Sequence, residues 1–351
     1  MQQIKIVYLV ILCVLILVMG SGLVYSPNSE KSCDSAPKIE KDSIYNIKEK
    51  TLQFEDKLKY KINLRNSLIQ WNSKLKYRLF KSSINTNQAV IGKNDWVYYS
   101  NKSDKIVDSY THQNNYTEEE LSEFITVLEQ RQQMLNNKGI QFCQAVWPNK
   151  STIYPEHMPA RYRNQKKDQP SRMSEFYEAM QGSEVPLVDM RETFRTIKDT
   201  SLIYLKHDTH WNDLGAYYAY SALMKQLGIE PYPLSDFKLT WKSRAKGDLL
   251  SLIGLCNATT ITEMEPILEY KGDKSVEIIE RQGETGPLYR CVNAEQNKTL
   301  LMFRDSFGSA LRPYLSLHFR ASYYPWKKYN PGMVNRIKPD IVICASVERY
   351  L

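Results

Sequence analysis

Several patterns that would assign this sequence directly to a class of protein are absent. No two of the six cysteines form a C-x-x-C pair, so neither a zinc ribbon nor a dithiol redox motif is indicated. The 47 Lys and Arg residues are scattered, and without a compact basic run the net charge of +8 does not indicate nucleic-acid binding. We therefore expect no nucleic-acid partner and a mildly basic surface that suits an anionic lipid or polymer.

No internal repeat or low-complexity tract stands out, and what remains is the composition of an ordinary folded protein. Hydrophobic residues make up 42% and charged residues 25% of the 351 residues, and the 24 Tyr and 6 Trp exceed what a disordered chain carries. This length suffices for one large domain or two modest ones with a substantial core.

The N-terminus carries a long apolar run, from Ile6 to Val24, after a short segment that includes Lys5. A bilayer-spanning helix needs about 20 residues, so residues 1–26 are predicted to be a transmembrane signal-anchor. Gly20-Ser21-Gly22 leaves cleavage as an alternative. In either case we expect an extracytoplasmic domain, and with an uncleaved anchor a single-pass location at the cell membrane.

Five cysteines follow the apolar run, and an oxidising compartment permits disulfides among them. Cys143 and Cys344 lie in apolar, strand-like runs and are expected to be buried and free. Cys256 and Cys291 are a possible pair, although the sequence alone does not determine connectivity.

After a polar stalk over residues 27–53, strands and helices alternate through residues 54–351. Strand-like runs are expected at 89–99 (as strand, turn, strand), 140–146, 185–188, 202–205, 299–303 and 340–345. Helices are expected at 54–80, 117–138, 171–180, 212–227 and 306–315. This order predicts an α/β fold with a mainly parallel sheet flanked by helices. Residues 232–298 are less regular and are predicted to be an insertion outside the core.

Two short segments carry the candidate chemistry, and each lies between an expected strand and an expected helix, where open α/β sheets place their sites. The first is His207-Asp208-Thr209-His210-Trp211, and the second is Arg304-Asp305-Ser306. Ser306 is the candidate nucleophile, His210 the base and Asp208 the group that orients the imidazole. The amides that follow Ser306 would then stabilise an oxyanion.

Each of these residues also has a purely structural interpretation. Asp305 caps the following helix in the simplest view, and Trp211 is either a core residue or a sugar platform. His207, Asp208 and His210 are also potential metal ligands, but no remaining histidine has a suggestive spacing, so neither a metal nor a cofactor is expected.

The two segments together resemble the alginate O-acetyltransferase group, the AlgX/AlgJ-like and DHHW branch of SGNH-type proteins. Other stretches that resemble this family are 54–80, Val90-Ile91-Gly92-Lys93-Asn94-Asp95-Trp96-Val97-Tyr98, Trp147-Pro148-Asn149-Lys150, Ile153-Tyr154-Pro155, Pro186-Leu187-Val188-Asp189-Met190-Arg191 and Pro339-Asp340-Ile341-Val342-Ile343. The resemblance covers residues 54–351, interrupted near 232–298, and implies an SGNH-hydrolase-like fold.

The resemblance further implies transfer of acetyl groups to an exported polysaccharide, through the triad of Ser306, His210 and Asp208. It also implies a membrane-bound O-acyltransferase partner that supplies acetyl groups across the bilayer. Arg304 stands where the usual SGNH motif has glycine, so the oxyanion donors do not carry over. Candidate substrate contacts are Tyr98, Lys150, Tyr154, Trp211 and Arg304.

Two other functions stay open from the sequence alone. The first is a carbohydrate acetylesterase that uses the same triad, and the second is a non-catalytic, membrane-anchored protein that binds or assembles a polysaccharide. An acyl-enzyme at Ser306 would separate the catalytic hypotheses from the last one.

Overall fold

The structure is a computed structural model that describes residues 63–351 apart from 81–82, 84, 246, 256–260 and 280–283. The expected anchor at 1–26 and the stalk at 27–53 thus lie outside the described residues. Within the described part, no helix combines the length and the apolar character needed to cross a membrane.

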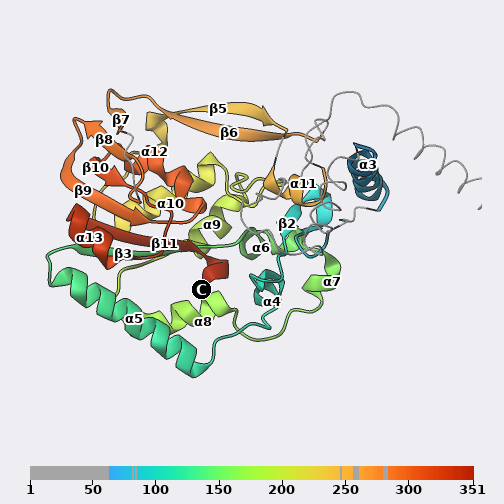
Figure 1. Cartoon of the computed structure of the whole chain (residues 1–351), viewed down its shortest axis with the longest axis horizontal. Helices are drawn as coiled ribbons and strands as arrows, with labels where there is room; N and C mark the ends of the chain where they lie inside the picture. Colours follow the sequence, from blue (N-terminus) through green and yellow to red (C-terminus); the bar gives the residue numbers. More distant parts are fainter. Residues whose placement is uncertain (1–62, 81–82, 84, 246, 256–260, 280–283) are drawn as a thin grey trace, which may run out of the picture.

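A seven-stranded sheet forms the centre of the fold, in the order β4-β3-β11-β9-β10-β8-β7 (Figure 1). Its strands are β3 (Gln141–Trp147), β4 (Leu187–Asp189), β7 (Ser275–Ile279), β8 (Leu288–Val292), β9 (Gln296–Phe303), β10 (Phe319–Tyr323) and β11 (Ile341–Val347). The five strands from β4 to β10 in this order are parallel, and β8 and β7 continue the sheet antiparallel. The sheet is therefore mixed, where the sequence predicted a mainly parallel one.

Side chains alternate between the two faces of the sheet, and this alternation builds two hydrophobic layers. In β3, Phe142 and Val146 pack in one cluster while Cys143, Ala145 and Trp147 pack in the other. The first layer is covered by α5 (Glu118–Asn136), α8 (Arg172–Ala179) and α13 (Pro331–Ile337), and the second by α9 (Arg191–Lys198), α10 (Asp213–Gln226) and α12 (Arg312–Leu315).

Local capping explains where the principal helices begin. Thr117 caps α5 and forms a capping box with Glu120, as the sequence predicted. Ser171 caps α8, and the Asn212 side chain accepts the Gly215 N–H at the start of α10. The start of α10 matters for function, because it immediately follows the His-Asp segment.

Residues 232–298 require a correction, since they are not an insertion outside the core. They contribute β7 and β8 to the main sheet, and β5 (Phe237–Arg244) pairs with β6 (Glu263–Tyr270) in a separate antiparallel ribbon. This ribbon lies along α10 (Figure 1) and leads into the short helix α11 (Asp248–Leu252). The irregular composition hid strands whose faces are only half covered.

Two further expectations differ from the structure. Residues 202–205 do not form a strand and make only one isolated bridge, between Tyr204 and Trp211. The strand β10 was missed. By contrast, β1 (Ala89–Ile91) and β2 (Val97–Tyr99) form the predicted hairpin, whose turn holds Asn94 and Asp95 at positive φ.

The described helix α3 (Asn63–Phe80) corresponds to the last part of the helix expected at 54–80. Two of its large apolar residues, Trp71 and Leu79, are exposed. Cys143 and Cys344 are buried free thiols, as expected, and Cys291 is also free, while Cys256 lies outside the described residues.

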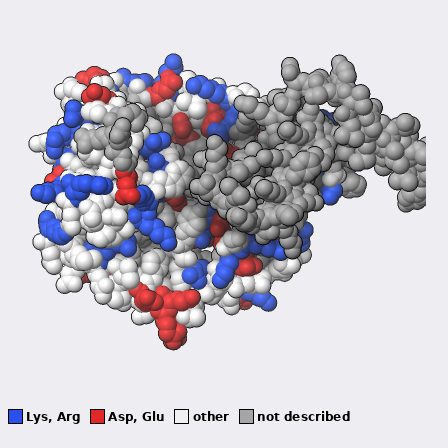
Figure 2. All heavy atoms as spheres, viewed as in Figure 1, with Lys and Arg blue, Asp and Glu red and all other residues white. Residues whose placement is uncertain are grey.

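Charged side chains are mixed on the face of the molecule shown in Figure 2, where basic groups alternate with acidic and neutral ones. The acidic group at the lower edge lies where α5 begins, with Glu118, Glu119 and Glu120 in its first turn. Negative charge at a helix N-terminus stabilises the helix dipole.

Candidate active site

The candidate residues converge at the carboxyl edge of the parallel strands, where α/β proteins place their sites. Lys150 follows β3, Ser306 follows β9 and Arg349 follows β11. Asp208 and His210 lie in the loop that the Tyr204–Trp211 bridge closes. The helix α10 follows this loop and holds it at the same edge.

Asp208 and His210 form a directly bonded pair. The His210 Nδ1 atom lies 2.7 Å from Asp208 Oδ1, and the His210 backbone N–H donates to the same oxygen at 3.0 Å. The Asp208 side chain is 4% exposed and that of His210 is 31% exposed. The sharp turn between them therefore orients the imidazole with Nδ1 towards the carboxylate and Nε2 away from it.

The second oxygen of Asp208 is bound by the end of β5 and by the start of α11. Arg244 Nη2 donates to Asp208 Oδ2 at 2.7 Å, and the Asp248 N–H lies 3.3 Å from the same atom. Burial alone would raise the pKa of Asp208, but the hydrogen bonds and charge of His210, with the charge of Arg244, hold that pKa well below its usual value. Asp208 is thus an ionised carboxylate throughout the neutral range.

Asp248 is a second carboxylate on the Nδ1 side of His210. Its Oδ2 atom lies 3.8 Å from His210 Nδ1, and its Oδ1 accepts the Thr209 N–H at 2.7 Å. Burial and the neighbouring charge of Asp208 raise the pKa of Asp248. The loop backbone is therefore fixed by the same side chain that adds negative charge beside the imidazole.

Lys150 organises this loop from beneath. Its buried ammonium donates to the carbonyl oxygens of Leu205 at 3.0 Å, Lys206 at 3.1 Å and Asp208 at 2.6 Å. Burial lowers the pKa of Lys150 to about 7, against the opposing attraction of the nearby carboxylates. All three donor positions of the ammonium are used inside the protein, so we reassign Lys150 from substrate contact to positioning residue.

Residues of the ribbon and of the turn after β5 also contact the backbone of this loop. Glu263 accepts the Lys206 N–H at 2.6 Å and the His207 N–H at 3.2 Å. Gly247 approaches so closely that an added Cβ would lie 1.9 Å from the His207 carbonyl oxygen. Any larger residue at position 247 would displace the loop that carries Asp208.

The Ser306 turn is held by Asp305 rather than by the ribbon. Asp305 Oδ1 accepts the Phe307 N–H at 2.9 Å and the Gly308 N–H at 3.4 Å, while Oδ2 accepts the Val347 N–H at 2.6 Å. Asp305 thus caps the 3₁₀ helix η5 (Phe307–Leu311), which replaces the α-helix expected there, and ties it to β11. Burial raises the pKa of Asp305.

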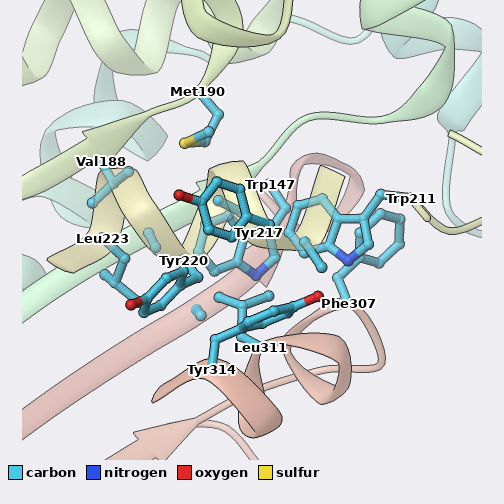
Figure 3. Packing of buried hydrophobic residues seen from close by; sticks show 14 of the residues in the cluster. Trp147, Val188, Met190, Trp211, Tyr217, Tyr220, Leu223, Phe307, Leu311 and Tyr314 are labelled. Atoms are coloured by element: carbon cyan, nitrogen blue, oxygen red, sulfur yellow. The ribbon is translucent and has the colours of Figure 1, made fainter. Parts of the chain in front are cut away.

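Phe307 brings the two segments together. Its ring lies 4.8 Å from that of His210 and 5.1 Å from that of Trp211, measured between centroids. Figure 3 shows Trp211 and Phe307 side by side at one end of the cluster, with Tyr217, Tyr220 and Tyr314 to their left. Since Ser306 immediately precedes Phe307, this packing places the serine turn beside the imidazole.

Ser306 immediately precedes Phe307, whose ring contacts that of His210, and the structure has no hydrogen bond between Ser306 and His210. Ser306 is half-buried, and among the described residues the buried His210 Nε2 atom has no hydrogen-bond partner. Catalytic hydrogen bonds are often long in a protein without substrate, so this geometry leaves Nε2 available for a proton from a hydroxyl.

Arg304, which stands at the position of the usual glycine, is used structurally and faces outward. Its Nε donates to the Tyr324 carbonyl at 3.1 Å, and Nη1 donates to Asp305 O at 3.0 Å and Ser309 Oγ at 2.7 Å. Its guanidinium carbon also lies 5.2 Å from the ring centroid of the exposed Trp326.

Three other expected substrate contacts are buried in the core, so the structure assigns them to packing. Trp211 is 3% exposed and packs edge-on against Trp147 and Phe194. Tyr98 donates to the Tyr154 carbonyl at 2.7 Å, and the Tyr154 hydroxyl accepts the Ile203 N–H at 3.1 Å. These rings support the loop from below and have no face left for a sugar.

A metal interpretation fits this cluster poorly. One ligand atom each from Asp208, His210 and Asp248 lie within 4.8 Å of one another, which is close enough to surround a cation. However, the Arg244 guanidinium already occupies the outer oxygen of Asp208 and would repel a metal ion. The arrangement therefore favours acid–base chemistry.

Sequence reasoning missed Arg244, Asp248, Glu263 and Arg349. The first three lie in the irregular segment that was assigned outside the core, and no motif singles them out. Arg349 lies with its guanidinium carbon 5.6 Å from the Phe307 ring centroid and borders a polar recess of about 440 Å³ that reaches the start of α5. Only the strand ending at Val347 gave a signal for that position.

Comparison with known proteins gives the class of this fold. Two solved structures share it: a DHHW family protein from Eubacterium siraeum (TM-score 0.54, 15% identity, 76% of this chain and 92% of that one) and Bacillus cereus PatB1 (TM-score 0.55, 14% identity, 74% and 95%). At these identities the likeness concerns the fold alone, and it shows a shared α/β architecture.

Residues 89–279, just over half of the chain, match the family described as SGNH hydrolase-like domain, acetyltransferase AlgX. The chain belongs to this family. A probable alginate O-acetylase AlgJ from Pseudomonas aeruginosa is 25% identical over 180 residues, which are 47% of this chain and 41% of that protein. The chain therefore spans less than half of this relative's length. The family match includes Asp208 and His210 but ends before Ser306.

Proposed function

We propose that this protein transfers acetyl groups to hydroxyls of an exported polysaccharide through an acyl-serine at Ser306. The observation that carries the proposal is the oriented imidazole: Nδ1 is bonded to an ionised Asp208, and the buried Nε2 has no partner among the described residues and lies beside the Ser306 turn. The acetyltransferase family supports the choice of acyl group, and the likeness to a probable alginate O-acetylase supports a polysaccharide acceptor.

In the first half-reaction, His210 Nε2 takes the proton of the Ser306 hydroxyl as Oγ attacks the acetyl carbonyl. The donor's leaving oxygen departs with that proton, and an acetyl ester remains on Ser306. Asp208 keeps the imidazole in the tautomer that accepts at Nε2 and stabilises the imidazolium. The Phe307 and Gly308 amides are already bonded to Asp305, so the Ser306 N–H is the amide of this turn left for the oxyanion.

In the second half-reaction, an acceptor hydroxyl gives its proton to His210 Nε2 and attacks the acetyl carbon. The ester forms on the sugar, and the proton returns to Ser306 Oγ, which restores the enzyme. An acetylesterase, in which water takes the place of the acceptor hydroxyl at the same triad, is the second candidate, and product analysis with a polysaccharide acceptor separates the two.

The setting of the reaction is also part of the proposal. An N-terminal anchor over residues 1–26 would hold the domain on the extracytoplasmic side of the cell membrane. There, a membrane-bound O-acyltransferase partner would supply acetyl groups and an exported polysaccharide would receive them. No cofactor enters either half-reaction.

The test is the intact mass of the full chain, solubilised in detergent, after incubation with p-nitrophenyl acetate. The wild type is expected to gain one acetyl group and to release nitrophenol, while Ser306→Ala gains none. Ser309→Ala, which loses a hydroxyl in the same short helix, is the matched control and should still be acetylated. Equal ester consumption by wild type and Ser306→Ala would sink the assignment.

A further inference from the structure

The segment after β10 lies beside the segment that carries Ser306. Strands β9 and β10 are parallel, with Tyr323 opposite Leu301, and the pairing continues beyond the strands because the Arg304 N–H donates to the Pro325 carbonyl at 3.2 Å. Continuing this register places Trp326 opposite Arg304, at the carboxyl edge of the sheet. Arg304 itself is two residues before the nucleophile Ser306.

Trp326 is held at this edge but is not buried. It is 64% exposed, although the Arg304 guanidinium carbon lies only 5.2 Å from its ring centroid. That guanidinium is itself fixed by bonds to the Tyr324 carbonyl and to Ser309 Oγ. A large, flat apolar ring is therefore held in solvent by a rigid support. Burial would stabilise a tryptophan that binds nothing, so the exposure of this ring favours a role in binding.

A cation lies against Trp326. The Arg304 guanidinium contacts the ring, and burial together with the positive charge of Arg312, whose Nη1 donates to the Tyr289 hydroxyl at 2.8 Å, lowers the pKa of Arg304, so a second arginine lies near the first. A sugar ring offers a flat face of C–H groups to an aromatic ring, and a guanidinium binds carboxylates and hydroxyls. Both chemistries meet here within reach of the serine turn.

We infer that Trp326 and Arg304 form a subsite for an acidic sugar ring of the acceptor polysaccharide. The sugar would stack on the exposed indole and direct its carboxylate towards the guanidinium. This inference rests on the proposed function for the identity of the ligand, but it concerns acceptor binding and not formation of the acyl-serine.

Binding of a hexamannuronate probe tests the subsite. It is measured by calorimetry on the full chain in detergent, in the Ser306→Ala background so that no reaction occurs. Trp326→Ala should weaken binding about tenfold, and Trp326→Phe should retain most of it because the ring remains. Trp71→Ala is the matched control, since Trp71 is 63% exposed but lies on α3, away from this edge in Figure 1, and it should bind as the parent does.

Unchanged affinity of Trp326→Ala, an equal loss in Trp71→Ala, or no binding of the probe by the parent would each overturn the subsite. Acetylation of Ser306 by p-nitrophenyl acetate, measured with Trp326 intact and with Trp326 replaced, tests the proposed function separately from the subsite. Normal acetylation with unchanged probe binding would refute the subsite alone. Absent acetylation with Trp326-dependent binding would refute the acyl-serine alone.

Discussion

The two halves of the candidate site are supported very differently. The loop that carries Asp208 and His210 is held by Lys150 through three carbonyls, by Glu263 through two amides and by Arg244 through the carboxylate itself. The Ser306 turn relies on its own neighbour Asp305, which binds two amides of the turn and one of β11.

This difference indicates that the base His210 is preorganised, whereas the nucleophile Ser306 reaches its catalytic geometry only when substrate binds. Buried charged groups keep the imidazole in one orientation before any ligand arrives, which is how preorganised sites lower the barrier. The serine turn lacks such a network, and its hydroxyl has no bond to His210 in the described structure. Damage to the loop should therefore cost more than damage to the turn.

The largest effect is expected from Asp208→Asn. Loss of the carboxylate removes both the tautomer control and the negative charge beside His210, so acetylation of Ser306 should slow by roughly 10³- to 10⁴-fold. The rate is measured as nitrophenol release from p-nitrophenyl acetate. Asp189→Asn is the control, because Asp189 also pairs with an arginine, Arg191 at 2.6 Å, but at the edge of the sheet on β4.

Stability should follow the same carboxylate in acid. The pKa of Asp208 is lower in the folded than in the unfolded chain, so its contribution is present above the unfolded value and lost as pH falls below it. The difference in free energy of unfolding between wild type and Asp208→Asn should therefore shrink as the pH falls below about 4. A difference that grew in acid would contradict the ion-paired carboxylate.

Arg244→Met is expected to have the next largest effect. The variant keeps the length of the side chain but releases Asp208 Oδ2 and the partner Glu265, whose Oε1 lies 3.0 Å from Arg244 Nη1. The acetylation rate should fall by about 10- to 100-fold, as for other groups that orient a catalytic residue. Arg244→Lys should recover part of this loss, and the small-ester KM should stay unchanged in both.

A merely structural role for Arg244 would lower the melting temperature and the activity together, with no rescue by lysine. In double variants, the losses from Arg244→Met and Asp208→Asn should not add, because both act through the same carboxylate. Additive losses would show that Arg244 acts elsewhere.

Much of the fold could be predicted because its strongest signals are local. The apolar runs that became β3, β9 and β11 are buried on both faces, so they stand out without any knowledge of neighbours. The capping box at Thr117 and the cap at Asn212 are likewise written within a few residues. β7, at the edge of the sheet, and β8, beside it, were missed because both strands are only partly buried and their composition is mixed.

The candidate site divides in the same way. Asp208 and His210 could be paired from the sequence because only Thr209 separates them and one turn joins them. Arg244 reaches Asp208 across a ribbon and a loop, and its partner residues are set by tertiary packing that no spacing encodes. Lys150 was noticed, but the sequence could not show that its ammonium points inward.

Lys150→Met should act mainly on stability. Removing the ammonium leaves the carbonyl oxygens of Leu205 and Asp208 without this donor, while Lys206 O keeps the Val97 N–H at 2.9 Å, and the loss should cost about 2 kcal/mol in the free energy of unfolding. Lys198→Met is the matched control, since Lys198 also donates to a carbonyl, that of Ile153 at 2.8 Å, but from a position nearer the surface. Urea unfolding of both variants measures the difference.

The pH dependence of that cost has a definite sign. The pKa of Lys150 falls from 10.5 when unfolded to about 7 when folded, so its stabilising contribution is lost progressively as the pH falls from 10.5 to about 7. The advantage of wild type over Lys150→Met should therefore increase between pH 7 and 10. An advantage that decreased over this range would mean that the ammonium stays charged in the folded protein.

The smallest effect is expected from Asp305→Asn, which tests the weaker half of the comparison. The amide keeps one oxygen for the Phe307 N–H but opposes the Val347 N–H with an N–H group of its own. Burial already penalises the charge of Asp305, as its raised pKa shows, and the neutral amide avoids that penalty. The two changes partly cancel, so the free energy of unfolding should fall by about 1 kcal/mol and the acetylation rate by only a few-fold. If Asp305→Asn instead slowed acetylation more than Arg244→Met, the serine turn would be the part that must be held before substrate binds, and this difference between base and nucleophile would be reversed.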